Sequence, residues 1–151
     1  MDGKHILLVE DDDDDETLLK LALSRNGMAV PLTVARDGRE ALDFLEGKGR
    51  FAGRRPDDPP ALILLDLKMP KVGGLEVVRQ VRRSPATRAV PVVILTSSNE
   101  PQDIEQAYAL GANSYLLKPV DLASLVELVR DLGRYWLHHN VLPTPGRDPG
   151  G

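Results

Sequence analysis

The chain has 151 residues, a formal net charge of -4 and an isoelectric point near 5.4. This length suits one domain with a sizeable hydrophobic core, and the charge argues against a protein that binds nucleic acid by neutralising its phosphates. The absence of cysteine excludes disulfides and thiolate metal sites, and no apolar run has the length of a signal peptide or a membrane span. We therefore expect a cytoplasmic protein that binds neither nucleic acid nor membranes.

The chain opens with a strand and a helix. Residues 5–9 are largely aliphatic, which indicates a strand buried on both faces. Apolar residues recur at helical spacing over residues 17–26, and Gly27 is a typical helix stop. An acidic run, residues 10–16, connects the two predicted elements.

The acidic run divides into two parts. Glu10 and Asp11 lie next to the strand end, so we assign them to a functional site at the edge of the sheet. Asp13 and Glu16 have the spacing of a capping box, and acidic residues in a first helical turn interact favourably with the helix dipole. We assign this second part to the start of the helix, and Asp12 could belong to either part.

The next segments repeat the pattern of strand and helix. Residues 32–35 predict a strand, and residues 37–45 predict a helix. Residues 47–60 are rich in Gly, Arg, Asp and Pro, and we expect a mobile surface loop there, although its basic first half could contact a partner. Residues 62–65 are continuously aliphatic and end on Asp66, which predicts a buried strand with a carboxylate at its tip.

The remaining chain continues the alternation to its last helix. The predicted elements are a helix over residues 75–83, a strand over 90–95, a helix over 101–110, a strand over 113–117 and a helix over 121–138. Residues 139–151 are rich in Pro and Gly and predict a flexible tail, which leaves a single domain over residues 1–138. Five alternations without an internal repeat predict an α/β fold, a parallel sheet with helices on both faces.

Polar side chains follow four of the five predicted strands. They are Glu10 and Asp11 after the first, Asp66 after the third, Thr96 and Ser97 after the fourth, and Lys118 after the fifth. Parallel strands present their carboxyl ends at one edge of the sheet, so these side chains should converge. Clustered carboxylates repel one another unless a cation neutralises them, and oxygen ligands without His or Cys favour Mg²⁺.

This set of groups suits phosphoryl transfer onto a carboxylate. Asp66 would be the nucleophile, Lys118 and the metal would offset charge on the transferring group, and the Thr96 hydroxyl would donate a hydrogen bond. One alternative is a Mg²⁺-dependent phosphatase with an aspartyl-phosphate intermediate, although such enzymes usually have a second acid where this chain has Lys68. Another alternative is a constitutive dimeric adaptor with a vestigial site.

Four motifs resemble those of the bacterial response-regulator receiver domain. They are Leu8-Val9-Glu10-Asp11, Leu64-Leu65-Asp66-Leu67-Lys68-Met69-Pro70, Ile94-Leu95-Thr96-Ser97 and Tyr115-Leu116-Leu117-Lys118-Pro119. The resemblance covers residues 4–138 and implies a flavodoxin-like (βα)5 sandwich with strand order 2-1-3-4-5. The loop after the second motif departs from the family, which often has Asp-Gly where this chain has Gly73-Gly74.

The resemblance also implies roles for the site residues. Asp66 resembles the residue that accepts phosphate from the phosphohistidine of a sensor histidine kinase. Glu10 and Asp11 resemble the acidic metal pair, and the backbone carbonyl of Lys68 is a further expected ligand for Mg²⁺. The protein would then be a signalling protein and not an enzyme, with only its own phosphorylation and slow autodephosphorylation as reactions.

Three further residues resemble the parts of the family's conformational switch. Thr96 resembles the hydroxyl that closes on the phosphate, and Tyr115 resembles the aromatic switch, although an aromatic residue on a strand could simply pack. Lys118 resembles the lysine that pairs with the phosphate, followed by a cis bond to Pro119. Phosphorylation would bias a pre-existing equilibrium and change the face of the fourth and fifth strands.

The last predicted helix carries an apolar face wider than one sheet face can cover. Its stripe at three- and four-residue spacing consists of Leu122, Leu125, Val129, Leu132 and Trp136. We expect an isologous homodimer through this helix and the fifth strand, with Val141 and Leu142 packing across the interface. The alternative is a monomer in which the helix is fully covered.

Three segments resemble single-domain receivers that are paired with bacterial phytochrome histidine kinases. They are the long loop before the third strand, Tyr135-Trp136-Leu137 and Val141-Leu142-Pro143. This narrower resemblance implies a light-sensing kinase as the partner, and a chain without a DNA-binding output domain.

Overall fold

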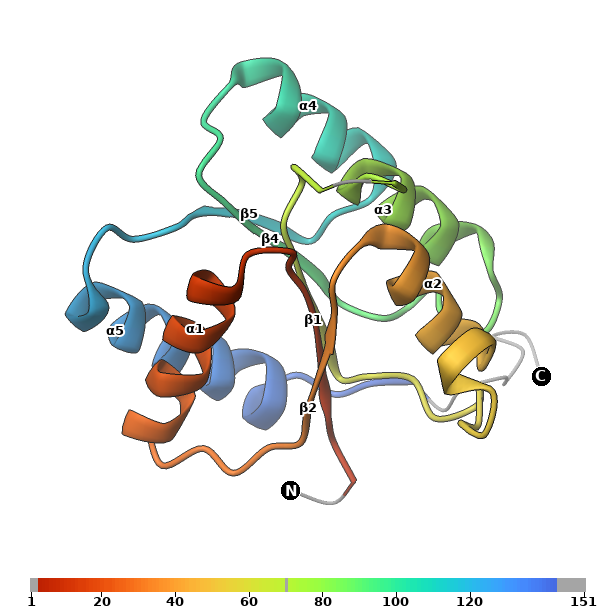
Figure 1. The fold of residues 1–151 in the computed structure, drawn as a ribbon, viewed down its shortest axis with the longest axis horizontal. Coiled ribbons are helices and arrows are strands. Elements are labelled where there is room, and N and C mark those ends of the chain that lie inside the picture. Colours follow the sequence, from red (N-terminus) through yellow and green to blue (C-terminus); the bar gives the residue numbers. More distant parts are fainter. Residues whose placement is uncertain (1–2, 70, 144–151) are drawn as a thin grey trace.

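Residues 3–69 and 71–143 are described here from a computed structural model of the chain (Figure 1). Five parallel strands form one sheet in the order β2-β1-β3-β4-β5, as the resemblance implies. The strands are β1 (Ile6–Val9), β2 (Leu32–Ala35), β3 (Leu62–Leu65), β4 (Val92–Thr96) and β5 (Ser114–Leu117). The α-helices are α1 (Asp13–Arg25), α2 (Gly38–Glu46), α3 (Gly74–Arg83), α4 (Pro101–Leu110) and α5 (Leu122–Leu132). Pro70, the last residue of the second motif, and most of the predicted tail, residues 144–151, lie outside the described residues.

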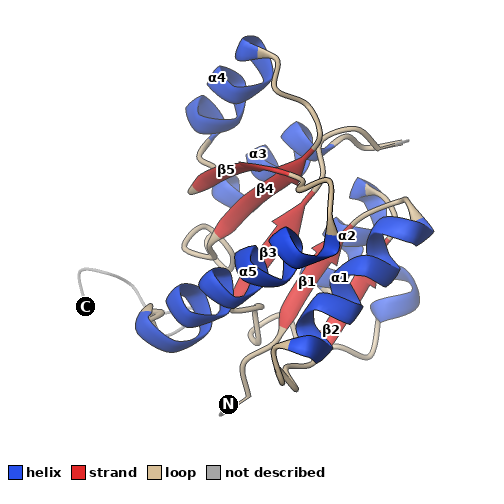
Figure 2. Ribbon diagram, turned by 90° about the vertical axis from the view of Figure 1, so that its left-hand side faces the viewer, coloured by secondary structure: helices blue, strands red, loops and turns tan. Residues whose placement is uncertain are grey.

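Helices cover both faces of the sheet. Consecutive residues of a strand point to opposite faces. Leu7 and Ile63 pack with residues of α2, α3 and α4 on one face, and Leu8 and Leu64 pack with residues of α1 and α5 on the other. Figure 2 shows α1 and α5 side by side on their face of the sheet. Burial on both faces explains why β1 and β3 are continuously aliphatic and do not alternate with polar residues.

The backbone of neighbouring strands holds the residues at the carboxyl edge of the sheet. Val9 lies opposite Leu65 in the register of β1 and β3. One residue beyond the strand ends, the amides of Glu10, Asp66 and Lys118 each donate to a carbonyl of the adjacent strand, over 2.9, 3.1 and 2.9 Å. The positions from which these three side chains start are therefore set by the sheet itself.

Two of the differences between predicted and observed boundaries have a clear physical cause. The N-cap of α1 is Asp12 and not Asp13, because the Asp12 carboxylate accepts hydrogen bonds from the amides of Asp14 and Asp15, at 2.8 and 3.0 Å. The fourth strand begins after Pro91, which has no amide hydrogen to donate to a neighbouring strand. Asp12, which the sequence left between two assignments, therefore starts the helix.

The last predicted helix changes its winding. Beyond α5, residues 133–139 continue as a π-helix, η2 (Gly133–His139). The Lys4 ammonium donates to the carbonyl of Leu137 over 2.6 Å, which ties the amino-terminal segment to this turn. Leu137 is buried, whereas Tyr135 is 54% exposed. No helix among residues 3–69 and 71–143 is long and apolar enough to cross a membrane.

The loop over residues 47–60 is anchored by its arginines, in contrast to the mobile segment that we expected. The Arg54 guanidinium lies 3.9 Å over the ring of Phe44 and donates to the Phe44 carbonyl over 2.7 Å. Phe51, in a 3-10 turn over residues 49–51, packs edge-on against the same ring. Arg50 pairs with a carboxylate of α2 over 2.9 Å. These basic side chains make contacts within the chain.

The apolar stripe that we predicted as a dimer interface lies mostly inside the chain's own core. Leu125, Val129 and Leu132 are buried between α1, α5 and the sheet. Leu122 and Trp136 are half-buried. The prediction is therefore wrong for Leu125, Val129 and Leu132, because α5 packs on both α1 and the sheet and so buries a wider face than the sheet alone would cover.

Candidate functional site

The predicted carboxylates meet at the carboxyl edge of the sheet. Glu10, Asp11 and Asp66 each place one carboxylate oxygen within 4.8 Å of the other two. The Lys118 ammonium donates to Glu10 over 2.8 Å and to Asp66 over 3.0 Å. Glu10 and Asp66 are largely buried, and Asp11 is exposed. Four residues from three separate connections thus form one cluster, as the parallel topology predicts.

The cluster has more negative than positive charge. Burial is the main cause that raises the pKa of Glu10, to about 7, against the opposing effect of the hydrogen bond from Lys118. Burial alone would lower the pKa of Lys118, but its hydrogen bonds to Asp15, Glu10 and Asp66 raise it, so the ammonium stays charged. Three carboxylate oxygens this close together are a donor set that suits a hard divalent cation such as Mg²⁺.

We expect the stability of the protein in buffer free of divalent cations to fall as the pH rises from about 4.5 to about 7. Over this range the folded protein keeps a proton on Glu10 that the unfolded chain has released, because burial raises the pKa only in the folded state. Urea unfolding across this range measures the effect. The Glu10→Gln variant cannot titrate and should lose most of this dependence, and an unchanged dependence in that variant would contradict the assignment.

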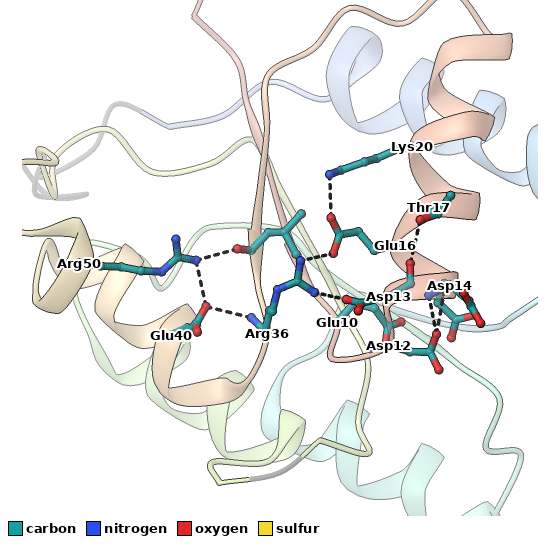
Figure 3. Close-up of polar contacts among 12 residues, drawn as sticks. Glu10, Asp12, Asp13, Asp14, Glu16, Thr17, Lys20, Arg36, Glu40 and Arg50 are labelled. Atoms are coloured by element: carbon teal, nitrogen blue, oxygen red, sulfur yellow. Dashed lines mark hydrogen bonds and ion pairs between the residues drawn. The ribbon is translucent and has the colours of Figure 1, made fainter.

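Figure 3 shows how the rest of the acidic run is divided among partners. Asp13 pairs with Arg36 over 2.6 Å. Glu16 pairs with Arg36 over 2.8 Å and with Lys20 over 2.7 Å, and the hydrogen bond from Lys20 is the main cause that lowers its pKa. The amide of Arg36 donates to Glu40 of α2 over 3.1 Å. These contacts join the start of α1 to the connection between β2 and α2, so this part of the run is structural.

Asp15 also belongs to the cluster at the strand ends, although its place in the sequence predicted only a helix start. Its carboxylate accepts a hydrogen bond from the Lys118 ammonium over 2.6 Å, the shortest of the three contacts that Lys118 makes with carboxylates. No motif distinguishes Asp15 from the acidic residues on either side of it. Only the direction of the first turn of α1 relative to β5 places it beside Lys118.

A second set of contacts links the predicted switch residues to α4. The buried Thr96 hydroxyl accepts a hydrogen bond from the Ser98 amide over 3.4 Å, and the Tyr115 hydroxyl donates to the Ser98 carbonyl over 2.7 Å. The Ser98 hydroxyl donates to Asp103 over 2.6 Å, and the Lys68 ammonium lies 3.5 Å from the same carboxylate. Asp103, which no motif had indicated, therefore links the first turn of α4 to the loop after β3, through Lys68, and to the loop after β4, through Ser98.

Residues 6–130 match the model of the response regulator receiver domain family. The chain belongs to this family. Receiver domains are phosphorylated by histidine kinases and bind Mg²⁺ or Mn²⁺ in an acidic pocket.

Several relatives match this receiver domain over most of their length. The probable methanogenesis regulatory protein FilR2 of Methanothrix harundinacea is 42% identical over 143 residues, which cover 93% of this chain and 88% of that protein. Response regulator Rcp1 of Synechocystis is 36% identical over 140 residues, 93% of each protein. The Mn²⁺-bound structure of Rcp1 has a TM-score of 0.82 over 93% of this chain and 99% of that chain, at 36% identity. The bacteriophytochrome response regulator RtBRR is 48% identical, with a TM-score of 0.75 over 97% of this chain and 85% of that chain.

Two details that the resemblance implies, the cis bond before Pro119 and the Lys68 carbonyl as a metal ligand, have different outcomes in this receiver domain. No cis peptide bond occurs within the described part of the chain, so the expected cis bond between Lys118 and Pro119 is wrong, and this bond has the intrinsically favoured trans form. The Lys68 amide lies 3.4 Å from an oxygen of Asp66, and its side chain extends toward α4. The role of the Lys68 carbonyl as a metal ligand stays a prediction.

A glycine sets how closely α3 approaches the receiver site. A Cβ atom on Gly74 would lie 2.4 Å from the backbone oxygen of Asp66, whereas one on Gly73 would meet no atom closer than 4.0 Å. This chain therefore keeps glycine at the crowded position of the Asp-Gly pair that the family often has. The departure from the pattern falls on the position with room for a side chain.

Proposed function

We propose that this receiver domain accepts a phosphoryl group on Asp66 from a sensor histidine kinase, with Mg²⁺ held by Glu10, Asp11, Asp66 and the backbone carbonyl of Lys68. The observation that supports this most is the convergence of Asp66 with two further carboxylates and the Lys118 ammonium. A nucleophilic carboxylate, an ammonium and an oxygen donor set for a divalent cation are the groups that this transfer requires.

In the proposed transfer, an oxygen of the Asp66 carboxylate attacks phosphorus while the bond from phosphorus to the kinase histidine breaks. The leaving imidazole takes up a proton. Bound Mg²⁺ would supply positive charge against the oxygens of the transferring group. Lys118, which already touches Asp66, pairs with a phosphoryl oxygen, and the Thr96 hydroxyl donates a hydrogen bond to another.

The signal would leave through the connection between β4 and α4. A Thr96 hydroxyl that turns to the phosphoryl group gives up its hydrogen bond from the Ser98 amide. Ser98 also accepts a hydrogen bond from Tyr115 and donates one to Asp103. Phosphorylation thus biases the position of α4 and the ring of Tyr115. NMR signals of the Tyr115 ring should shift on addition of Mg²⁺ and beryllofluoride. An unchanged ring together with unchanged affinity for a partner would contradict this route.

A bacterial phytochrome histidine kinase is the proposed phosphodonor. RtBRR, 48% identical to this chain, is a bacteriophytochrome response regulator, whereas FilR2 is a probable methanogenesis regulator. Phosphotransfer from a purified bacteriophytochrome kinase should be at least about tenfold faster than from an unrelated histidine kinase, a difference of about 1.4 kcal/mol in activation free energy. Equal rates from both kinases would contradict the proposal that a bacteriophytochrome kinase is the phosphodonor. The proposal that Asp66 accepts the phosphoryl group would be unaffected.

A homodimer through β5 and the last helix is also proposed, on a surface that includes Trp136 of the predicted stripe. A groove between these elements is lined by the apolar side chains Leu116, Leu128, Tyr135 and Trp136, and β5 is an edge strand of the sheet. Leu142, which we expected to pack across the interface, packs against the core of its own chain. An exposed apolar groove beside an edge strand suits an isologous contact with a second copy.

We expect light scattering at micromolar concentration to give the mass of a dimer, and Tyr135→Ser to weaken dimerisation at least about tenfold, because aromatic side chains contribute strongly to interfaces. Tyr108→Ser on α4 is the matched control, since Tyr108 is 51% exposed and Tyr135 is 54% exposed. A wild-type chain that is monomeric at this concentration would refute the dimer.

A further inference from the structure

Lys118 contacts one carboxylate that is not part of the proposed metal site. Its ammonium donates to Glu10, Asp66 and Asp15, over 2.8, 3.0 and 2.6 Å. Glu10 and Asp66 are among the three acids whose oxygens lie within 4.8 Å of one another, and Asp15 is not. Asp15 approaches from α1, where its amide donates to the N-cap residue Asp12 over 3.0 Å. The first turn of α1 therefore holds this third carboxylate against the ammonium and outside the group of three acids.

We propose that Asp15 is a positioning residue that draws Lys118 toward α1 and so leaves Glu10 and Asp66 available to a divalent cation. The inference rests on the proposed function, because it takes the cation as the ligand of these two carboxylates.

Competition for the same oxygens is the physical reason. An ammonium paired only with Glu10 and Asp66 would hold both carboxylates, and a cation that binds them would have to displace it. The Lys118 side chain is only 18% exposed, so an ammonium that loses its partners is not compensated by full hydration. Asp15, whose side chain is 36% exposed, supplies a partner that does not bind the cation.

The surroundings of the pair leave room for this shift. A cavity of about 40 Å³ borders Glu10, Asp15 and Lys118, and its other lining residues, among them Leu18 and Pro119, are apolar. Its volume is enough for about one water molecule. The Lys118 side chain therefore has free space next to its contact with Asp15.

Calorimetric titration of Mn²⁺ into the full chain, without a phosphodonor, tests the proposal. Asp15→Asn should weaken Mn²⁺ binding about three- to tenfold, the range for losing one partly buried charged partner. Asp14→Asn is the matched control, because it removes the same charge from the neighbouring residue, which is exposed and has no contact with Lys118. It should leave the affinity within about twofold of the wild type.

A second background separates an effect through Lys118 from a direct attraction between Asp15 and the cation. In Lys118→Met, the further change Asp15→Asn should leave Mn²⁺ affinity unaltered, because no ammonium remains to be held. With acetyl phosphate as donor, Asp15→Asn should raise the half-saturating Mg²⁺ concentration and leave the rate at saturating Mg²⁺ within about twofold.

Three outcomes would overturn the role of Asp15. They are an equal loss of affinity in Asp14→Asn, a full loss that persists in the Lys118→Met background, and tighter Mn²⁺ binding by Asp15→Asn. A failure of the proposed function is distinct from these, since it would appear as a wild-type chain that neither binds Mn²⁺ nor becomes phosphorylated.

Discussion

Asp66→Asn is expected to lower the rate of Mg²⁺-dependent phosphorylation by acetyl phosphate by roughly 10³-fold or more. The amide has almost the same shape as the carboxylate but is a very weak nucleophile, so the acyl phosphate cannot form. The fold should be retained, because the variant removes a carboxylate that repels the largely buried Glu10. Phosphate incorporation per chain, followed over time, measures the rate.

The control for this variant is Asp57→Asn, in the exposed loop before β3, which should be phosphorylated like the wild type. Labelling of Asp66→Asn at the wild-type rate would show that another residue is the acceptor. A phosphate ester given to the wild type distinguishes the phosphatase alternative, since one label per chain is expected of a receiver and continuous release of phosphate is expected of a phosphatase.

Gly74→Ala is expected to destabilise the fold by about 1–3 kcal/mol, the range for forcing extra atoms into a well-packed region. The added methyl group would lie 2.4 Å from the backbone carbonyl oxygen of Asp66 and 2.8 Å from the Leu67 Cα atom, so the start of α3 or the end of β3 has to move. A shift of the Asp66 backbone also displaces its carboxylate from Lys118. We therefore expect phosphorylation to slow by about tenfold as well.

Gly73→Ala adds the same methyl group one residue earlier and is the matched control. Its nearest neighbour would be 4.0 Å away, and Gly73 has an ordinary extended backbone, with φ -76° and ψ 167°. Phosphate incorporation should stay close to the wild type, and urea unfolding should show a loss of only about 0.5–1 kcal/mol, because Ala is a poorer N-cap residue than Gly. Equal effects of the two substitutions would contradict the close approach of α3.

The positions of the main site residues could be predicted because the sheet backbone sets them. Continuous aliphatic runs identified β1, β3 and β4, and parallel strands place the residues that follow them at one edge. The amides of Glu10, Asp66 and Lys118 continue the hydrogen bonding of the sheet, so little freedom remains in where their side chains start.

Side-chain directions in the adjoining helices could not be predicted in the same way. Asp15 and Asp103 both lie in a first helical turn, where acidic residues are favourable in any helix, so their sequence positions carried no sign of a link to the site. The apolar stripe of α5 had the correct period, but periodicity does not reveal what covers a face. Packing against α1 as well as the sheet buried Leu125 and Val129, and this depends on how the two helices are placed.

The intact mass of the protein after incubation with acetyl phosphate, with and without Mg²⁺, is the most direct test of the site. Convergence of Asp66, the acidic pair and Lys118 predicts the addition of one phosphoryl group per chain with Mg²⁺ and almost none when a chelator removes it. A mass that does not change with Mg²⁺ present, or that increases equally without it, would contradict a metal-assisted phosphoacceptor at this edge of the sheet.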